Sequence, residues 1–245
     1  MHIRRASTSR FSRSPSCAVA VLKSSPDAAT GASPNFMTYN AAGRHPHCKA
    51  DAMFPQTPAA TVALSVAARF YSPALINHCV RSYLWGAMYG AAHGIAFDDE
   101  LYYVSALLHD IGLTDAFDSH RVPFEEAGAD LAWVFGVAAG WPADRAARAT
   151  EIIVLHMRDD VSATADPESH ILQVATSWEV VGRRPEEFPA EARAEILARY
   201  PRQGFGSEFL ACFEDQARRK PGSAAAASVA NNAAGRIKAN PLDAR

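Results

Sequence analysis

The amino-acid sequence predicts an all-α fold for residues 53–245, and three observations support this prediction. From Pro58 onward, apolar residues recur at helical spacing, and the alternation of β-branched residues that marks strands is scarce. Proline, glycine and small polar residues fall between the apolar segments, where helices begin and end. Hydrophobic residues make up 49% of the chain, which is too many for a disordered protein. We therefore expect a compact bundle of roughly seven or eight helices with short connections.

The boundaries of the expected helices follow from their end signals. Ser72 is a helix N-cap with proline directly after it, and Gly94 ends the helix that follows. Asp98 or Asp99 caps the next helix, and Gly112 lies just past its end. The expected helices cover residues 74–93, 100–110, 124–135, 143–157, 167–181, 187–200, 205–219 and 224–239.

Residues 1–52 differ from the rest of the chain in composition and charge. The first 50 residues hold seven Lys or Arg and one acid, whereas the remaining residues hold 17 against 25, so the net charge of −2 describes neither part. Proline, serine, glycine and asparagine crowd residues 24–46 and leave little to bury. We predict a disordered extension, or a start codon placed too early with Met37 or Met53 as the true first residue. An Arg- and Ser-rich transit peptide is the alternative.

Composition and charge exclude several classes of function. A body with 17 bases against 25 acids lacks the basic footprint that nucleic-acid binding needs. No apolar run reaches the roughly 18–20 residues of a membrane-spanning helix. The four cysteines are scattered and form no CxxC pair, which argues against a zinc ribbon or a thioredoxin-type site. We expect a cytoplasmic protein with reduced thiols and with neither nucleic acid nor a membrane as a partner.

Three ionisable residues indicate a polar centre inside the bundle. His109 and Asp110 end an apolar helix, and neighbouring helical residues can face one ion only from a helix end or a bend. We expect Gly112 to supply that bend. His78 lies one turn into its own helix among apolar residues. Burying such groups is costly unless each is paired or bound to a metal ion.

Two further residues extend the same pattern. His156 lies on a later apolar helix, and Glu179 is a lone carboxylate in the apolar segment of residues 172–182. Several ionisable residues on core-facing helices indicate one shared centre rather than separate buried charges.

In this ordered set of residues the sequence resembles the HD-domain superfamily of metal-dependent phosphohydrolases. Within the superfamily it is most similar to the branch of cyanamide hydratase and related proteins, and the resemblance covers most of residues 60–240. It implies an all-α HD-domain bundle with a metal site between helices. The peptides that carry it are INHCVRSYLWG (76–86), ALLHDIGLT (106–114), FEEAGAD (124–130), VLHM (154–157), DPESHILQVATSWEVVG (166–182) and KPGSAAAA (220–227).

The resemblance implies His78, His109 and Asp110 as metal ligands. The last ligand of the family is an Asp in the late helix, which this sequence lacks. Glu179 stands where the branch has that Asp and is taken as the fourth ligand, whereas Thr176 stands where the phosphohydrolases have theirs. The implied cofactor is one divalent ion, for which Zn, Fe, Mn, Ni and Co all suit the ligands, with zinc favoured. A catalytic zinc site needs three protein ligands and one open position.

The implied reaction is metal-assisted addition of water to a small polar molecule, such as hydration of cyanamide or a nitrile-like substrate. Asp110 would combine metal binding with orienting the water, and His156 would carry the proton because its ordinary pKa is about 6.5. Thr114, one turn beyond Asp110, would donate a hydrogen bond. The aromatic residues expected to wall a small dry pocket are Tyr83, Trp85 and Trp178.

Two other functions stay open. The first is a phosphohydrolase of nucleotides or phosphate monoesters, for which Arg81 and Arg121 are the candidate phosphate partners. The second is a degenerate domain that binds a metal ion or ligand without turnover, which the missing late Asp supports. The oligomeric state is also open, and a homo-oligomer is compatible with the sequence.

Each candidate site residue also has a purely structural interpretation. His109 and Asp110 would then form a simple helix C-cap, since a histidine there suits the helix dipole. His78 would be a hydrogen-bonded core histidine, and His156 a structural or supporting one. Glu179 would pair with Arg183 one turn away.

Overall fold

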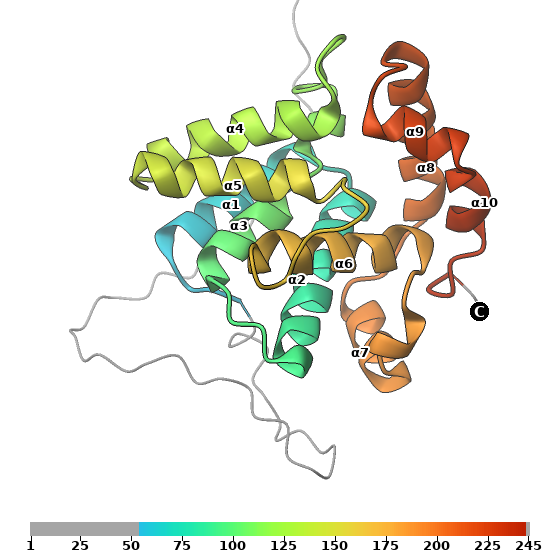
Figure 1. The fold of residues 1–245 in the computed structure, drawn as a ribbon, viewed down its shortest axis with the longest axis horizontal. Helices are drawn as coiled ribbons and strands as arrows, with labels where there is room; N and C mark the ends of the chain where they lie inside the picture. Colours follow the sequence, from blue (N-terminus) through green and yellow to red (C-terminus); the bar gives the residue numbers. More distant parts are fainter. Residues whose placement is uncertain (1–53, 244–245) are drawn as a thin grey trace, which may run out of the picture. The chain divides into compact units, whose positions relative to one another are not determined.

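The computed structural model describes residues 54–243, and within this range the chain is entirely helical apart from its connections (Figure 1). The all-α prediction is confirmed, whereas the predictions for residues 1–52 lie outside the described residues. The α-helices are α1 Pro58–Phe70, α2 Pro73–His93, α3 Asp99–Leu108, α4 Phe124–Ala138, α5 Ala143–Leu155, α6 Pro167–Val181, α7 Ala190–Arg199, α8 Phe205–Arg219, α9 Ala224–Ala230 and α10 Ala233–Lys238. Two 3-10 turns, Ile111–Leu113 and Pro185–Glu187, lie between them.

The helix starts are fixed by the side chains that the sequence suggests. The hydroxyl of Ser72 accepts a hydrogen bond from the backbone N–H of Leu75 at the start of α2. Asp98 and Asp166 cap α3 and α6 in the same way. Proline in the first turn of a helix has no N–H to leave unpaired, so it reinforces the starts of α2 and α6.

Several helix bounds differ from the prediction, and two of the differences shape the surroundings of the site. The helix expected over residues 100–110 ends at Leu108, which releases the next two residues from regular helix geometry. The single helix expected over residues 224–239 is divided into α9 and α10, because Asn232 adopts a left-handed backbone conformation with φ of 61°. Its side-chain oxygen then accepts from the N–H of Gly235 and starts α10 anew. Asparagine tolerates this conformation better than other residues with side chains.

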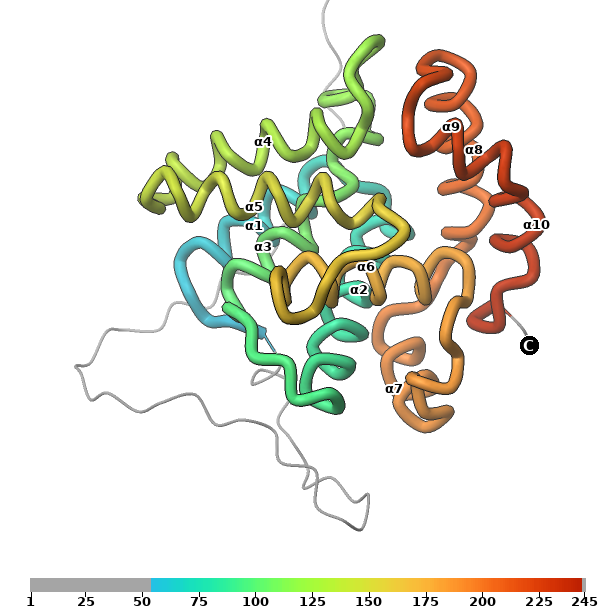
Figure 2. Tube along the Cα trace, in the orientation of Figure 1, coloured from blue at the N-terminus to red at the C-terminus, as the bar shows by residue number. Residues whose placement is uncertain are grey.

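Helices α2 and α6 pack against each other in the middle of the bundle (Figure 2). Helix α3 contacts α1, α2 and α5, and α4 pairs with α5 along its length. Helices α8, α9 and α10 follow one another at the carboxyl end and reach back to α2 and α6. The side chains at the centre are bulky and almost fully buried, among them Trp85, Tyr102, Phe124 and Trp178. This core holds the ends of α2, α3 and α6 in place around the candidate site.

No helix of the described residues is long and apolar enough to cross a membrane. Cys79 is a buried free thiol and Cys212 a half-buried one, while Cys17 and Cys48 lie outside the described residues.

Candidate metal centre and its cavity

Three predicted ligands converge at one point inside the bundle. His78 comes from the second turn of α2, and His109 and Asp110 follow the last residue of α3. The Nε2 atom of His78 lies 3.2 Å from Nε2 of His109 and 3.2 Å from Oδ2 of Asp110. The third side of this triangle, from His109 Nε2 to Asp110 Oδ2, is 3.3 Å. All three residues are at most 1% exposed, and they form a group able to hold a metal ion.

Proton positions make this triangle a cluster of acceptors. Nδ1 of His109 donates to the carbonyl of Ala106 at 2.8 Å, so its Nε2 is left with a lone pair directed at the cluster. Oδ2 of Asp110 is buried and has no hydrogen-bond partner within residues 54–243. Ligands about 2.0–2.1 Å from a tetrahedral ion are about 3.3 Å apart, which matches the sides of the triangle. The residues therefore fit a divalent metal ion with three protein ligands.

Electrostatics at the cluster favour a positive charge. Burial opposes ionisation of the Asp110 carboxyl, but the imidazoles of His109 and His78 hold its pKa well below its usual range. Burial likewise opposes protonation of His109, yet the neighbouring carboxylate of Asp110 raises the pKa of that imidazole well above its ordinary value. The carboxylate is thus ionised and attracts either a proton or a cation to the facing nitrogens.

The bend that brings His109 and Asp110 to one point is made at Asp110 itself, whose φ and ψ are −103° and 7°. Gly112, expected to make this bend, has no positive φ and serves another purpose. A Cβ atom on Gly112 would lie 2.1 Å from the carbonyl oxygen of Phe124 and 3.1 Å from the N–H nitrogen of Gly128. The glycine therefore lets the turn after α3 press against the start of α4.

Glu179 is not brought into the triangle. Its Oε1 accepts from Arg81 Nε at 3.0 Å, from Arg81 Nη2 at 2.6 Å and from Arg202 Nη1 at 2.7 Å, and its Oε2 accepts from Trp85 Nε1 at 2.7 Å. Burial alone would raise the pKa of Glu179, but Arg81, His78 and Arg202 hold it well below its usual range.

The structure therefore gives Glu179 a supporting position rather than that of the fourth ligand. Its Oε1 lies 3.7 Å from Nδ1 of His78, on the side of the ring opposite the triangle. The expected pair with Arg183 is wrong, since the partners of Glu179 are Arg81 and Arg202. At 3.7 Å, Oε1 of Glu179 and Nδ1 of His78 are too far apart for a hydrogen bond, so the carboxylate acts on the His78 ring through its charge.

The two threonines considered for the site lie in different places. Thr176 is buried on the cavity wall, and its hydroxyl donates to the carbonyl of Leu172 at 2.9 Å. Thr114 does not line the cavity, and its hydroxyl closes the 3-10 turn by donating to the carbonyl of Ile111 at 2.7 Å. The expected hydrogen bond from Thr114 to substrate is therefore not available in this arrangement.

His156 lies beside the triangle at the end of α5. Its ring is perpendicular to that of His109, with the ring centres 4.9 Å apart, and it lines the cavity. Nδ1 donates to the carbonyl of Ile153, which leaves Nε2 as an acceptor. Burial, and to a smaller extent the neighbouring imidazole of His109, lower the pKa of His156 to about 3, so the ring is neutral at physiological pH.

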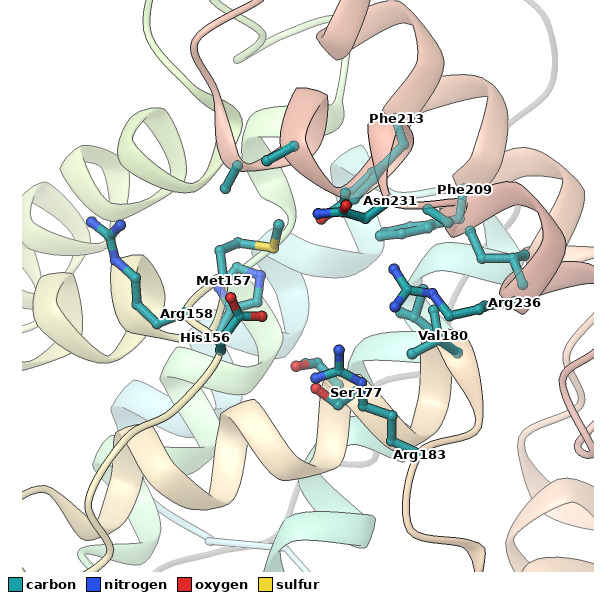
Figure 3. A pocket seen from close by; sticks show the side chains of 18 of the residues that line it. His156, Met157, Arg158, Ser177, Val180, Arg183, Phe209, Phe213, Asn231 and Arg236 are labelled. Atoms are coloured by element: carbon teal, nitrogen blue, oxygen red, sulfur yellow. The ribbon is translucent and has the colours of Figure 1, made fainter.

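An open cavity of about 590 Å³ lies over the triangle, and His78, His109 and Asp110 form part of its wall. His156 lines the same cavity (Figure 3). The expected aromatic wall is wrong. Tyr83, Trp85 and Trp178 are buried in the core behind the ligands, whereas the aromatic side chains that line the cavity are Phe209 and Phe213 of α8.

Arginines at the cavity were missed by sequence reasoning. Arg158, Arg183 and Arg236 line it, whereas the two arginines chosen from the sequence do not. Arg81 is fully buried against Glu179, and Arg121 is exposed outside the cavity. The sequence signal was weak, because an arginine at a helix end is equally explained by the helix dipole.

The fold and the site together define an all-α protein with a divalent-metal site on the wall of an open cavity. The HD domain family model matches residues 75–194, a segment that includes both histidines and the aspartate of the triangle. The chain therefore contains an HD domain, as the motif peptides predicted. The cavity wall formed by α8, α9 and α10 lies beyond the matched residues.

Two curated proteins resemble a larger part of the chain. The chain is 28% identical over 172 residues to cyanamide hydratase DDI2 of Saccharomyces cerevisiae. The alignment covers 68% of this chain and 76% of that protein. Cyanamide hydratase DDI3 of the same yeast matches with the same figures. Together with the HD domain, these relatives support a metal-dependent enzyme of the hydrolase type.

Proposed function

We propose that this protein adds water to a small polar molecule with the help of one bound divalent ion, for which zinc is the favoured candidate. The proposed reaction is hydration of cyanamide or a nitrile-like substrate. The observation that carries the proposal is the triangle of three buried acceptors, 3.2–3.3 Å on a side, on the wall of an open cavity. Similarity to the yeast cyanamide hydratases supports the choice of substrate.

His78, His109 and Asp110 would hold the ion, and a bound divalent ion lowers the pKa of water toward ~7 and polarises an electrophile. Hydration would turn the C≡N triple bond into a C–N single bond, with the oxygen of the water becoming the C=O oxygen and its two protons moving to the nitrogen. Cyanamide gives urea in this way, and other nitriles give amides. With three protein ligands, a tetrahedral site keeps one position open.

His156 is the residue placed to handle a proton. It lies beside His109 on the cavity wall, and its Nδ1–H is committed to the carbonyl of Ile153. Its free Nε2 can accept a hydrogen bond from a water molecule in the cavity and orient it. Because burial lowers the pKa of the ring to about 3, His156 is neutral at the start of the reaction, and its Nε2 is available as a hydrogen-bond acceptor.

Hydrolysis of phosphate monoesters or nucleotides is the second candidate, and the arginines on the cavity wall favour it. An assay of zinc-loaded protein that measures urea from cyanamide and phosphate from a nucleotide panel separates the two reactions. The proposal expects urea in preference to phosphate. Phosphate release without urea formation contradicts it, and bound metal without either product indicates a domain that binds without turnover.

The role of His156 has its own test. Replacing His156 with Gln should lower kcat for cyanamide by about 10²-fold, because the proton acceptor is lost, while metal content stays at that of the wild type. Metal analysis and steady-state kinetics on the same preparation check both parts. An unchanged kcat would show that the histidine is only structural.

A further inference from the structure

The cavity is much larger than the smallest substrate of the proposed reaction requires. Cyanamide has only three non-hydrogen atoms, whereas a volume of about 590 Å³ falls within the range of cavities that hold drug-sized ligands. The metal triangle occupies one part of the wall. The rest is formed largely by the end of α6 and by α8, α9 and α10.

Arg183 and Arg236 carry the positive charge of this second part. Arg183 directly follows Gly182, the left-handed C-cap of α6, and Arg236 lies in the last turn of α10. Figure 3 shows both side chains extending into the cavity, while that of Arg158 lies apart on the far side. Besides Asp110, the only acid on the cavity wall is Asp159. It follows Arg158 directly in the sequence and is distant in the sequence from Arg183 and Arg236.

These two guanidinium groups lack acidic partners, whereas seven of the fourteen arginines within residues 54–243 form ion pairs with carboxylates. Within residues 54–243, neither Arg183 nor Arg236 forms a side-chain hydrogen bond or an ion pair, and Nε of Arg236 is buried without a partner. By contrast, Arg81, Arg145, Arg148, Arg202 and Arg219 each bind carboxylates. A buried donor without a partner is costly, which indicates that a ligand completes it.

The chain holds the two arginines in fixed relation. The side-chain amide of Asn240 donates to the backbone carbonyl of Glu179 at 3.0 Å, which ties the segment after α10 to the last turn of α6. Pro241 packs so closely on Gly182 that a Cβ atom there would lie 2.5 Å from its Cδ. The ends of α6 and α10 are therefore locked together directly beside Arg183.

The geometry points to a subsite in which Arg183 and Arg236 bind an anionic group, a carboxylate or a phosphate, carried by the substrate at the end away from the metal triangle. Planar guanidinium groups recognise both kinds of anion through paired N–H donors. Asn231, on the same wall, adds an uncharged amide donor. Only the identification of the ligand as a substrate rests on the proposed function, because anion binding itself requires no turnover.

Anion binding is tested on the metal-loaded protein with succinate and inorganic phosphate as probes, by isothermal titration calorimetry. Arg183→Gln and Arg236→Gln should each raise the Kd of the preferred probe about tenfold. Arg236→Lys, which keeps the charge but loses the planar fork, should fall between wild type and Arg236→Gln. Arg218→Gln removes an equal charge from an exposed site outside the cavity and should leave Kd unchanged.

The probes distinguish the kinds of anion, and a kinetic comparison links the subsite to the reaction. Tighter binding of succinate assigns a carboxylate, and tighter binding of phosphate assigns a phosphate. The wild type should hydrate 3-cyanopropanoate with a higher kcat/KM than 3-cyanopropanamide. The variant that combines Arg183→Gln with Arg236→Gln should lose this preference. If each probe binds the wild type and the variant carrying both Arg183→Gln and Arg236→Gln with the same Kd, the subsite is overturned. Absence of any hydration with anion binding intact overturns the proposed function alone.

Discussion

The cavity has two ends that the chain builds in opposite ways. The metal triangle is at most 1% exposed, and each of its ligands is supported by the core around α2, α3 and α6. The arginine end is open, and its two guanidinium groups have no acidic partner within the described residues. The first end lies within the matched HD domain, whereas Arg236 and the phenylalanines of α8 lie beyond it. Under the proposed function, the metal end would supply the chemistry and the arginine end would select the molecule.

Removal of a ligand should give the largest effect and should be confined to the metal end. His109→Ala is expected to reduce bound metal from about one ion per chain to none and to lower kcat/KM by about 10³-fold or more, since the reaction depends on the ion. Metal analysis and kinetics measure the two effects. His93→Ala, at an exposed histidine paired with Glu187, is the matched control and should change neither. A variant that keeps its metal would break the assignment.

Glu179 tests whether the carboxylate behind His78 supports the metal end or belongs to it. Glu179→Gln leaves Arg81 buried without a counter-charge and leaves Arg202 with Asp243 alone, so it should lower the free energy of unfolding by about 3–5 kcal/mol. Thermal or denaturant unfolding measures this loss. Glu187→Gln, at an exposed ion pair, should cost about 0–1 kcal/mol. If Glu179 were instead the fourth ligand, metal content would fall while stability changed little.

Gly112 tests whether close packing of the turn after α3 sets the geometry of the triangle. Gly112→Ala places a methyl group against the carbonyl of Phe124, so the turn must move away from α4. We expect a loss of about 2–4 kcal/mol in stability and weaker metal binding. Gly222→Ala is the control, because nothing lies within 4 Å of a Cβ atom there. Equal melting temperatures for the two variants would contradict this role.

The smallest expected effect comes from α6 far from both ends of the cavity. Asp166 caps α6 and pairs with Arg148 at 2.7 Å, and Asp166→Asn keeps the cap while removing the charge. Burial alone would raise the pKa of Asp166, but Arg148 holds it below its ordinary value of about 3.9. The ion pair therefore adds stability above about pH 3.9 and loses it as the pH falls through the folded-state pKa.

Unfolding of wild type and Asp166→Asn across the pH range checks this sign. The wild type should be more stable by about 1 kcal/mol at pH 7, and the difference should vanish in acid. Metal content and the Kd of the anion probes should be equal in the two proteins. A difference that grows as the pH falls would contradict the assignment.

The sequence predicted the metal end far better than the arginine end, for physical reasons. His78, His109 and Asp110 stood out because ionisable side chains in apolar helices need a partner. Helices α6 and α8 began and ended at the expected residues because proline, glycine and basic residues marked their limits. Arg183 and Arg236 carried no comparable signal, since an exposed arginine at a helix end is ordinary.

Two errors in the prediction depended on contacts between distant segments. Glu179 was assigned to the metal ion from its place in the family pattern, since its partners Arg81 and Arg202 are far from it in the sequence and could not be recognised there. Trp85 and Trp178 were placed in the cavity because burial alone does not show which side of a helix faces it. The division of residues 224–239 at Asn232 has a different cause, because it depends on one local backbone conformation.

Anomalous X-ray scattering from crystals of the zinc-loaded protein, recorded at the zinc absorption edge, tests the central claim most directly. The account predicts one strong peak about 2.0–2.2 Å from Nε2 of His78, Nε2 of His109 and Oδ2 of Asp110, with Glu179 still bound to its two arginines. A peak at another group of residues, a peak that includes the carboxylate of Glu179, or no peak in protein that is fully folded would contradict it.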